Sequence, residues 1–197
     1  MIQRSFQLLD KVGPGKEKKI IEQVKDWNSF LEADSVKGIS KKNKLIYNLF
    51  LRQARKALHE GNTGFFVDKL PSTETWRLYP YFKGESCFLD IEVTGVQDDL
   101  TLIGIFDGLR TKTMIMGYNF DLRCLKRELA MYKLIVTFNG SSFDIPFLKK
   151  RYPGLIPNIP HIDLRHLCCR HGLTGGLKEI EKQLGIKRDN QIVDKMY

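Results

Sequence analysis

Two acidic residues, Asp90 and Glu92, stand at positions i and i+2 of the segment FLDIEVTG. On a β-strand such residues point to the same side, so both carboxylates are expected to face one point. Two negative charges held close together raise each other's pKa unless a cation lies between them. Carboxylate oxygens are the ligands that Mg²⁺ and Mn²⁺ prefer. The pair is therefore a candidate metal site, and the alternative is an edge strand with a solvated acidic face.

A third carboxylate, Asp144, follows a second strand pattern in the segment KLIVTFNGSSFDIPFL. The β-branched and aromatic residues 134–138 are typical of a buried strand, and Asn139-Gly140 ends it. Ser141 or Ser142 can cap a helix that begins near residue 143, which puts Asp144 in its first turn. Because α/β sheets commonly build sites at the carboxyl ends of strands, Asp144 is a candidate ligand. The alternative is that it only caps the helix.

The elements that must position these acids are predicted from the segment Phe88–Gly95 onward. The strand with Asp90 and Glu92 is followed, across a turn at 96–99, by strands at 101–107 and 112–118. Three antiparallel strands then give way to βαβ crossovers, as expected for a mixed five-stranded α/β sheet. A Rossmann arrangement does not fit, because it needs a helix directly after the first strand. The remaining predicted elements are a helix at 120–131, the strand at 134–138, the Asp144 helix, a strand at 161–163 and helices near 163 and at 177–184.

These segments together resemble a known family. The combination of D-x-E-x-T-G with F-N-G-x-x-F-D-x-P-F-L is similar to the DnaQ-like (DEDD) 3′–5′ exonucleases of the ribonuclease H-like fold, and most similar to their YprB-like branch. The resemblance extends from about Trp76 to Ile186. Its motifs are specific in combination, although D-x-E alone is not. They lie at Trp76–Phe82, Phe88–Gly95, Thr101–Gly108, Thr137–Pro153 and His161–Leu167.

The resemblance implies a two-metal nuclease that acts on single-stranded nucleic-acid ends with two Mg²⁺ or Mn²⁺ ions. Its metal ligands would be Asp90, Glu92 and Asp144. Two cations about 3.5–4 Å apart can stabilise the attacking and leaving oxygens of a phosphodiester. By the same resemblance, the terminal nucleotide would lie near Thr94, Gly95, Asn139 and Gly140.

The sequence departs from the family pattern at its end. A fourth carboxylate is expected in a later helix, with a Tyr or His before it, and none can be assigned here. Asp189 and Asp194 come too early, in a polar stretch. Either the chain is a truncated fragment, which we favour, or it is a naturally short homologue. Catalysis would then be impaired while metal binding survives.

A second cluster of metal-ligating residue types contains His161, Asp163, Cys168 and Cys169. By the resemblance, Asp163 is expected to brace the loop and helix that follow it, and the alternative is that it contacts a metal. A zinc site is a weaker interpretation, because the spacings form no C-x-x-C pair. The alternative is that Leu164, Leu167 and the two cysteines form the buried face of a helix.

Composition is compatible with a nucleic-acid partner. The 197 residues carry a net charge of +9 and are 42% hydrophobic, which is enough for one core and a small appendage. Basic clusters occur at Lys149–Arg151 and among Lys41, Lys42 and Lys44, although each alone is an ordinary solvated face. Four cysteines without regular spacing indicate a reducing, cytoplasmic environment. No signal peptide and no membrane-spanning segment are expected.

Residues 1–75 are predicted to form a separate helical region, and residues 76–197 the nuclease-like domain. The turn Val12–Gly15 precedes a helix and resembles half of a helix-hairpin-helix element, in which Gly13, Gly15 and Lys16 would approach a phosphate. The alternative is an ordinary packing unit. Residues 40–60 read as one amphipathic helix, with Leu45, Leu49, Ala54 and Leu58 among the residues expected to be buried.

Two functions remain open from the sequence. The favoured one is a metal-dependent 3′–5′ exonuclease, and its rival is a catalytically inactive nucleic-acid-binding module with the same fold. DNA and RNA are not distinguished, and neither oligomeric state nor protein partners can be derived.

Overall fold

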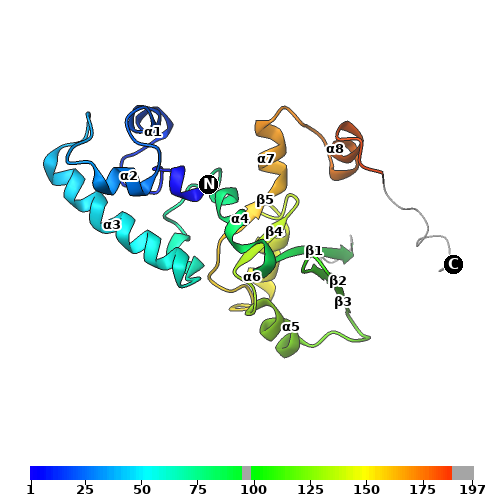
Figure 1. Cartoon of the computed structure of the whole chain (residues 1–197). Helices are drawn as coiled ribbons and strands as arrows, with labels where there is room; N and C mark the ends of the chain where they lie inside the picture. Colours follow the sequence, from blue (N-terminus) through cyan, green and yellow to red (C-terminus); the bar gives the residue numbers. More distant parts are fainter. Residues whose placement is uncertain (95–98, 188–197) are drawn as a thin grey trace.

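The structure is a computed structural model of the chain, and it describes residues 1–94 and 99–187. A five-stranded sheet occupies its centre, with α1, α2 and α3 on one side and α7 and α8 above it (Figure 1). The N-terminal helices are α1 (Pro14–Ile21), α2 (Trp27–Glu32) and α3 (Lys41–His59), and short turns η1 (Ile2–Arg4), η2 (Thr63–Phe66), η3 (Thr75–Leu78), α4 (Tyr79–Phe82) and η4 (Lys83–Glu85) accompany them. The sheet region contains β1 (Ser86–Thr94), β2 (Asp99–Phe106), β3 (Thr111–Ile115), α5 (Leu122–Leu129), β4 (Leu134–Thr137), α6 (Asp144–Arg151), β5 (His161–Asp163), α7 (Leu164–Arg170) and α8 (Leu177–Gln183).

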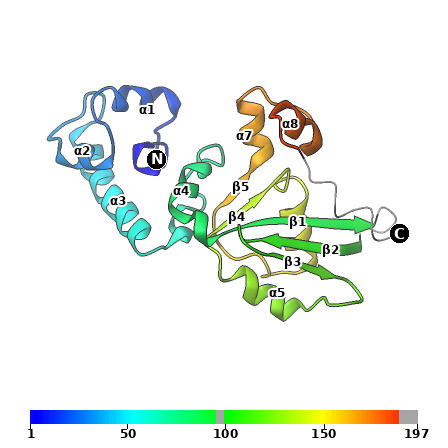
Figure 2. The same cartoon turned by 45° about the vertical axis from the view of Figure 1, so that its right-hand side comes forward.

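The strand order is β3-β2-β1-β4-β5, with β1, β2 and β3 antiparallel and β4 and β5 parallel to β1 (Figure 2). Parallel neighbours need crossover connections, and α5 and α6 supply them between β3, β4 and β5. The predicted fold class, a ribonuclease H-like mixed five-stranded sheet with a helical N-terminal region, is therefore confirmed.

One face of the sheet is closed by the two crossover helices. Cys87, Leu89 and Ile91 of β1 alternate toward this face and share a core with Leu125 of α5 and Leu148 of α6. Asp121 caps α5 by accepting hydrogen bonds from the backbone N–H groups of the first turn. This alternation along β1 leaves Asp90 and Glu92 on the opposite face.

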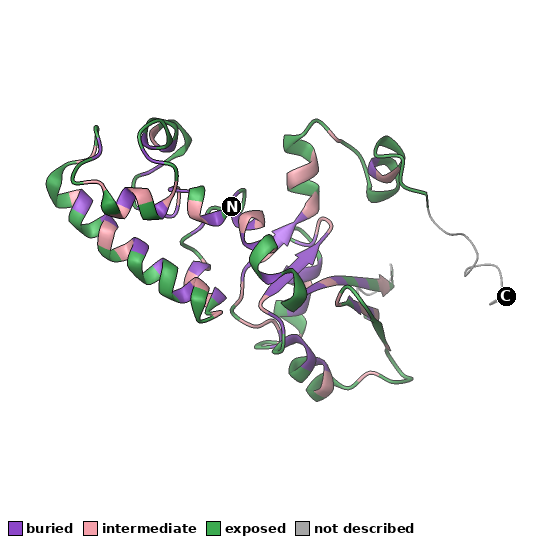
Figure 3. Ribbon diagram, in the orientation of Figure 1, coloured by how far each residue is buried: buried purple, intermediate pink, exposed green. Residues whose placement is uncertain are grey.

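On the opposite face, the described core residues of the sheet lie along β4 and β5, and Phe88 of β1 packs against them partly buried. There, Leu134, Val136 and Ile162 share a hydrophobic core with Leu78 and Phe82 and with buried residues of α1, α2 and α3. Buried residues are accordingly concentrated in β4 and β5 (Figure 3). Because one core includes residues from both sides of residue 75, the predicted division into 1–75 and 76–197 stays a prediction.

Helix α3 begins after Ser40, whose hydroxyl accepts a hydrogen bond from Asn43 N at 3.2 Å, as the amphipathic pattern predicts. The expected burial of Leu45 and Leu49 is wrong, since they are 67% and 64% exposed. Ala54 is buried as expected. The helix packs through a stripe rotated away from these leucines, and this stripe consists of Lys44, Tyr47, Leu51, Ala54 and Ala57.

Candidate metal and nucleic-acid site

Asp90 and Glu92 are exposed on β1 and share the face opposite the core formed with α5 and α6, as their spacing predicts. Asp90 stands across from Gly104 of β2, and Glu92 across from Leu102. Enclosure by neighbouring protein atoms raises the pKa of Asp90, and the negative charge of Glu92 raises it further. The predicted repulsion between the two carboxylates is therefore present.

Asp144 is delivered to β1 by the first turn of α6 and is 3% exposed. Its Oδ1 accepts a hydrogen bond from Ile91 N at 3.1 Å. The pairing of β4 with β1 ends at Phe88, so the carboxylate takes over an amide that a longer β4 would have bonded. This contact places Asp144 beside the strand residues that carry the other two acids.

The electrostatics of Asp144 are unfavourable. Burial raises the pKa of Asp144; the backbone N–H groups of Asp144 and Ile91 oppose this, but the negative charges of Asp90 and Asp163 add to it and the pKa remains raised. Among the described residues, neither Asp90, Glu92 nor Asp144 forms an ion pair with a basic side chain. Carboxylates with this much uncompensated charge fit a divalent cation, which would supply the missing positive charge.

The geometry of a complete metal centre is not formed. Within residues 1–94 and 99–187, no group of three or more His, Cys, Asp or Glu side chains is arranged to hold an ion. The three predicted ligands therefore remain a prediction, with Asp144 and Asp90 brought together along β1. Asp189 and Asp194, excluded above as the fourth acid, lie outside the described residues.

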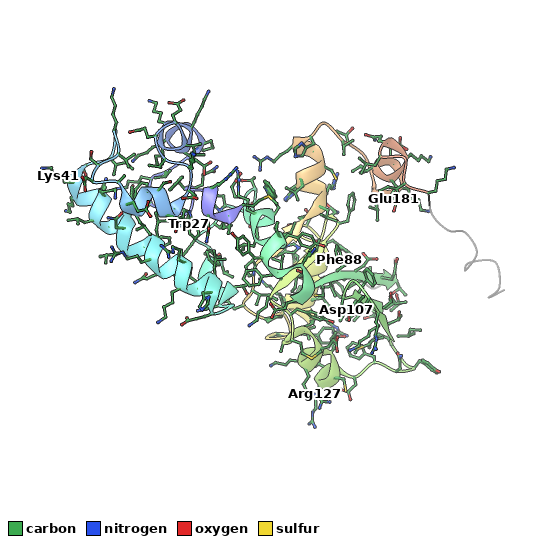
Figure 4. The ribbon with its side chains drawn as sticks, viewed as in Figure 1. Trp27, Lys41, Phe88, Asp107, Arg127 and Glu181 are labelled. Carbon is green, nitrogen blue, oxygen red and sulfur yellow. The ribbon has the colours of Figure 1, made fainter. Side chains whose placement is uncertain are left out.

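Asp90 lines an open cavity of about 330 Å³ on the face of the sheet opposite α5 and α6, where Leu164 of α7 and Leu177 of α8 also line it. Phe88 and Phe106, whose ring centroids are 6.0 Å apart, form part of its wall. Phe106 is 40% exposed, and Gly104 keeps the wall opposite Asp90 free of a side chain. Figure 4 shows Phe88 in the centre of the molecule, between α4 and the sheet.

Asp163 anchors the loop from β4 to α6 through hydrogen bonds to its backbone. This carboxylate is 6% exposed and accepts backbone hydrogen bonds from Asn139, Ser141 and Arg165 at 2.8, 2.9 and 3.0 Å. Burial alone would raise the pKa of Asp163, but the backbone donors of Ser141 and Asn139 hold it below its usual value. The predicted bracing role of Asp163 is confirmed, because it also caps α7.

Asn139 and Gly140 occupy a constrained turn in this loop. Asn139 has a φ of 65°, a region that Asn tolerates better than most residues. A Cβ on Gly140 would lie 2.3 Å from Thr137 Oγ1, so only glycine fits there. Thr137 Oγ1 accepts a hydrogen bond from Gly140 N and lies 2.8 Å from His161 Nε2. Burial lowers the pKa of His161, which favours the neutral ring.

The serine cap predicted for the Asp144 helix is absent. Residue 143 is the N-cap of α6, and no side chain caps it. A carbonyl of the preceding loop satisfies one N–H of the first turn instead, since Ile145 N donates to Gly140 O. The predicted helix start is correct, but its capping is wrong.

The remaining predicted nucleotide-contacting residues are only partly described. Thr94 is exposed, and its hydroxyl donates to Asp99 O at 3.4 Å. Gly95 lies outside the described residues. In the N-terminal region, Gly13 caps α1, and a side chain at Gly13 or Gly15 would meet no protein atom within 4 Å. Lys16 is half-buried, with its Nζ 5.8 Å from the centroid of the Tyr47 ring.

The cysteine cluster near α7 differs from the expected buried face. Cys169 is exposed and Cys168 is half-buried, and no residue of α7 is fully buried. Leu164 and Leu167 do pack, but only partly buried, against the N-terminal core. All four cysteines are free thiols.

Sequence reasoning missed two features of the site. The Thr137–His161 contact had no pattern that could reveal it. The second is a basic cleft on α3 with Arg52, Arg55 and Lys56, which a scan of charge along the helix could have found.

Comparisons with known proteins point to one family. The family model described as the RNase_H superfamily matches residues 87–196. A solved structure, the family B DNA polymerase from the hyperthermophilic archaeon Pyrobaculum calidifontis, is similar at 17% identity with a TM-score of 0.40, over 52% of this chain and 18% of that one. This chain thus spans less than a fifth of the polymerase. No curated protein matches the chain. Within the described residues, no helix is long and apolar enough to cross a membrane. With its family match over more than half of its length, the chain belongs to the RNase_H superfamily.

Proposed function

We propose that the protein is a divalent-metal-dependent 3′–5′ exonuclease of the DnaQ-like (DEDD) class, in its YprB-like branch. The single observation that carries the proposal is the position of Asp144. Its nearly buried carboxylate is bonded to Ile91 N beside Asp90, in a superfamily whose membership supports a nuclease-type function. Burying a carboxylate among like charges costs free energy, so a cation-binding role explains why the fold retains it.

Asp90 and Asp144 would hold a Mg²⁺ or Mn²⁺ ion, and Glu92, on the same face of β1, would complete its ligands after a side-chain rotation. Two such ions are expected in the active family. When bound, a divalent cation lowers the pKa of a water molecule and neutralises charge on a phosphodiester. Without that charge, the three carboxylates would repel a phosphate from the cavity.

The residues around Asp90 would orient the substrate. Phe106 offers an exposed ring on which a terminal base can stack, and Gly104 leaves space beside Asp90. Thr94, Gly95, Asn139 and Gly140 would line the same pocket. The Asp163 brace would keep the Asn139–Gly140 turn in one conformation and thereby fix the start of α6. Gly13, Gly15 and Lys16 would add a phosphate contact outside the active site.

Single-stranded ends of DNA or RNA are the proposed substrate. The free thiols fit a reducing cytoplasm, which we propose as the location. No membrane partner is proposed.

The test is degradation of a 5′-end-labelled single-stranded oligonucleotide in Mn²⁺. Stepwise shortening from the 3′ end is expected for the wild type, with a loss of at least 100-fold in Asp90→Ala and Asp144→Asn. The matched control is Asp107→Asn, which removes the charge of a partly exposed carboxylate in the β2–β3 turn. Cutting of a circular substrate would exclude an exonuclease.

A second candidate function is a catalytically inactive nucleic-acid-binding module. The absence of a three-ligand metal group from the described residues favours it. If the wild type binds the oligonucleotide but leaves it intact in Mn²⁺ and in Mg²⁺, this alternative replaces the exonuclease.

A further inference from the structure

Helix α3 has an unusual charge composition. Its 19 residues include six Lys or Arg residues and no Asp or Glu. Surface helices usually mix both signs, because opposite charges at i and i+4 stabilise them. A helix without Asp or Glu cannot form such pairs within itself, so its positive charges are not neutralised there.

The basic residues in the C-terminal half of α3 line an open cleft of about 760 Å³. Arg52, Arg55, Lys56 and His59 form one side of it, and Gln3 and Tyr81 contribute from η1 and α4. The four α3 residues that line the cleft are exposed, and Tyr81 is 44% exposed. The cleft is therefore lined by side chains that can reach a ligand in solvent.

The positive charge in this cleft is largely uncompensated. Lys56 lies 3.7 Å from Glu60 in an exposed pair, which contributes little. Within the described part of the chain, Arg52 and Arg55 have no ion-pair partner. Lys44, on the same helix, is different, because it is 5% exposed and donates to Asn48 Oδ1 at 2.8 Å.

The spacing of the basic residues suits a phosphate backbone. From Arg52 to His59 the helix rises about 10 Å. Along one strand of a nucleic acid the phosphates follow at about 3.4 Å of axial rise, so this span covers about three phosphates. Arg presents several donors that match phosphate geometry, and Tyr81 adds an aromatic face for a base or a donor for a phosphate.

We propose that this α3–α4 cleft, formed by Arg52, Arg55, Lys56, His59, Gln3 and Tyr81, binds a single-stranded nucleic-acid backbone at a site separate from Asp90. The inference rests on the proposed function only for the class of ligand. A second contact of this kind keeps the strand on the protein while its end is processed.

The test is binding of a fluorescein-labelled 20-nucleotide thymidine strand, measured by anisotropy in EDTA between 50 and 200 mM salt. The double variant Arg52→Ala/Arg55→Ala should bind at least tenfold more weakly. Its slope of log affinity against log salt should fall by about 1.4, since each single-strand phosphate contact contributes about 0.7. Tyr81→Ala should weaken binding about fivefold or more without changing the slope, because stacking releases no counterions.

The matched control is Arg123→Ala/Arg127→Ala, which removes two exposed arginines from α5. Figure 4 shows Arg127 at the lower end of the molecule, far from Lys41. Circular dichroism and thermal unfolding verify that each variant folds. The proposal is overturned if the α3 variant keeps its affinity and salt slope, or if the α5 control loses as much.

Two further measurements distinguish this inference from the proposed exonuclease activity and from binding to an anionic membrane. If the wild type binds the oligonucleotide in EDTA through α3 but cuts nothing in Mn²⁺, the exonuclease is refuted and the binding cleft on α3 stands. Binding of the protein to vesicles that contain phosphatidylserine tests whether the cleft binds an anionic membrane surface instead. If the α3 variant loses vesicle binding while oligonucleotide binding is unchanged, the cleft serves a membrane surface and the inference is wrong.

Discussion

Asp144 and Asp163 are both nearly buried carboxylates beside β4, and they differ in almost everything else. Asp163 accepts three backbone hydrogen bonds, and its pKa lies below its usual value. Asp144 accepts one from Ile91, lies near Asp90, and has a raised pKa.

The difference separates two uses of a buried charge. Where the protein itself supplies enough donors, as around Asp163, the carboxylate stabilises the fold. Where it supplies like charges instead, as around Asp144, the carboxylate is expected to destabilise the fold, and under the proposed function a cation would compensate it. The predictions below test whether this contrast holds.

The largest expected effect is on Asp163. Replacing it by Ala should lower the free energy of unfolding by about 3 kcal/mol, because three backbone donors lose their charged acceptor and α7 loses its cap. Urea denaturation at pH 7 measures it. A loss below about 1 kcal/mol would mean that water satisfies these amides and that the bracing is weak.

A second way to break the braced region is through Gly140. Gly140→Ala should cost about 2 kcal/mol, since its new Cβ would lie 2.3 Å from Thr137 Oγ1 and the turn must shift. Gly84→Ala is the control, because a Cβ there meets nothing within 4 Å. Equal stability of the two variants would contradict the close packing of this loop.

The two carboxylates should respond to pH in opposite directions. Since the pKa of Asp163 is lowered in the fold, its stabilisation is present above the ordinary Asp value of about 3.9 and is lost as pH falls through the folded value. The stability gap between wild type and Asp163→Asn should therefore narrow between pH 5 and pH 2. A gap that is independent of pH would show that charge is not what Asp163 contributes.

For Asp144 the sign is reversed, because its pKa is raised. Its charge destabilises the fold above the raised pKa, and this cost disappears as pH falls below the ordinary value. Asp144→Asn, which keeps an acceptor for Ile91 N, should therefore unfold about 2–4 °C higher at pH 7, the shift that 1 kcal/mol produces in a domain of this size. If Asp144→Asn melts at a lower temperature than the wild type at pH 7 in EDTA, Asp144 stabilises the fold as Asp163 does, and the contrast is wrong.

Much of the fold could be predicted from the sequence, because the relevant signals are local. Alternation along 86–94 and the fully buried run at 134–137 fixed the strands and the faces of Asp90 and Glu92. The burial of α3 was not predictable in detail, since Leu45, Leu49 and Tyr47 are all apolar and only tertiary packing selects among them.

The site shows the same division. The approach of Asp144 to β1 followed from strand order, but its bond to Ile91 N depends on where β4 ends relative to β1. The capping of α6 was mispredicted because a serine hydroxyl and a backbone carbonyl compete for the same N–H group. In the tight turn at Gly140, the carbonyl of Gly140 accepts the hydrogen bond from Ile145 N.

The most direct test is calorimetric titration of the metal-free protein with Mn²⁺ at pH 7. The account predicts saturable binding by the wild type and by Asp107→Asn, and loss of that binding in Asp90→Ala and in Asp144→Asn. Unchanged Mn²⁺ affinity in the Asp144 variant would contradict it, because the buried charge would then have no cation to compensate it.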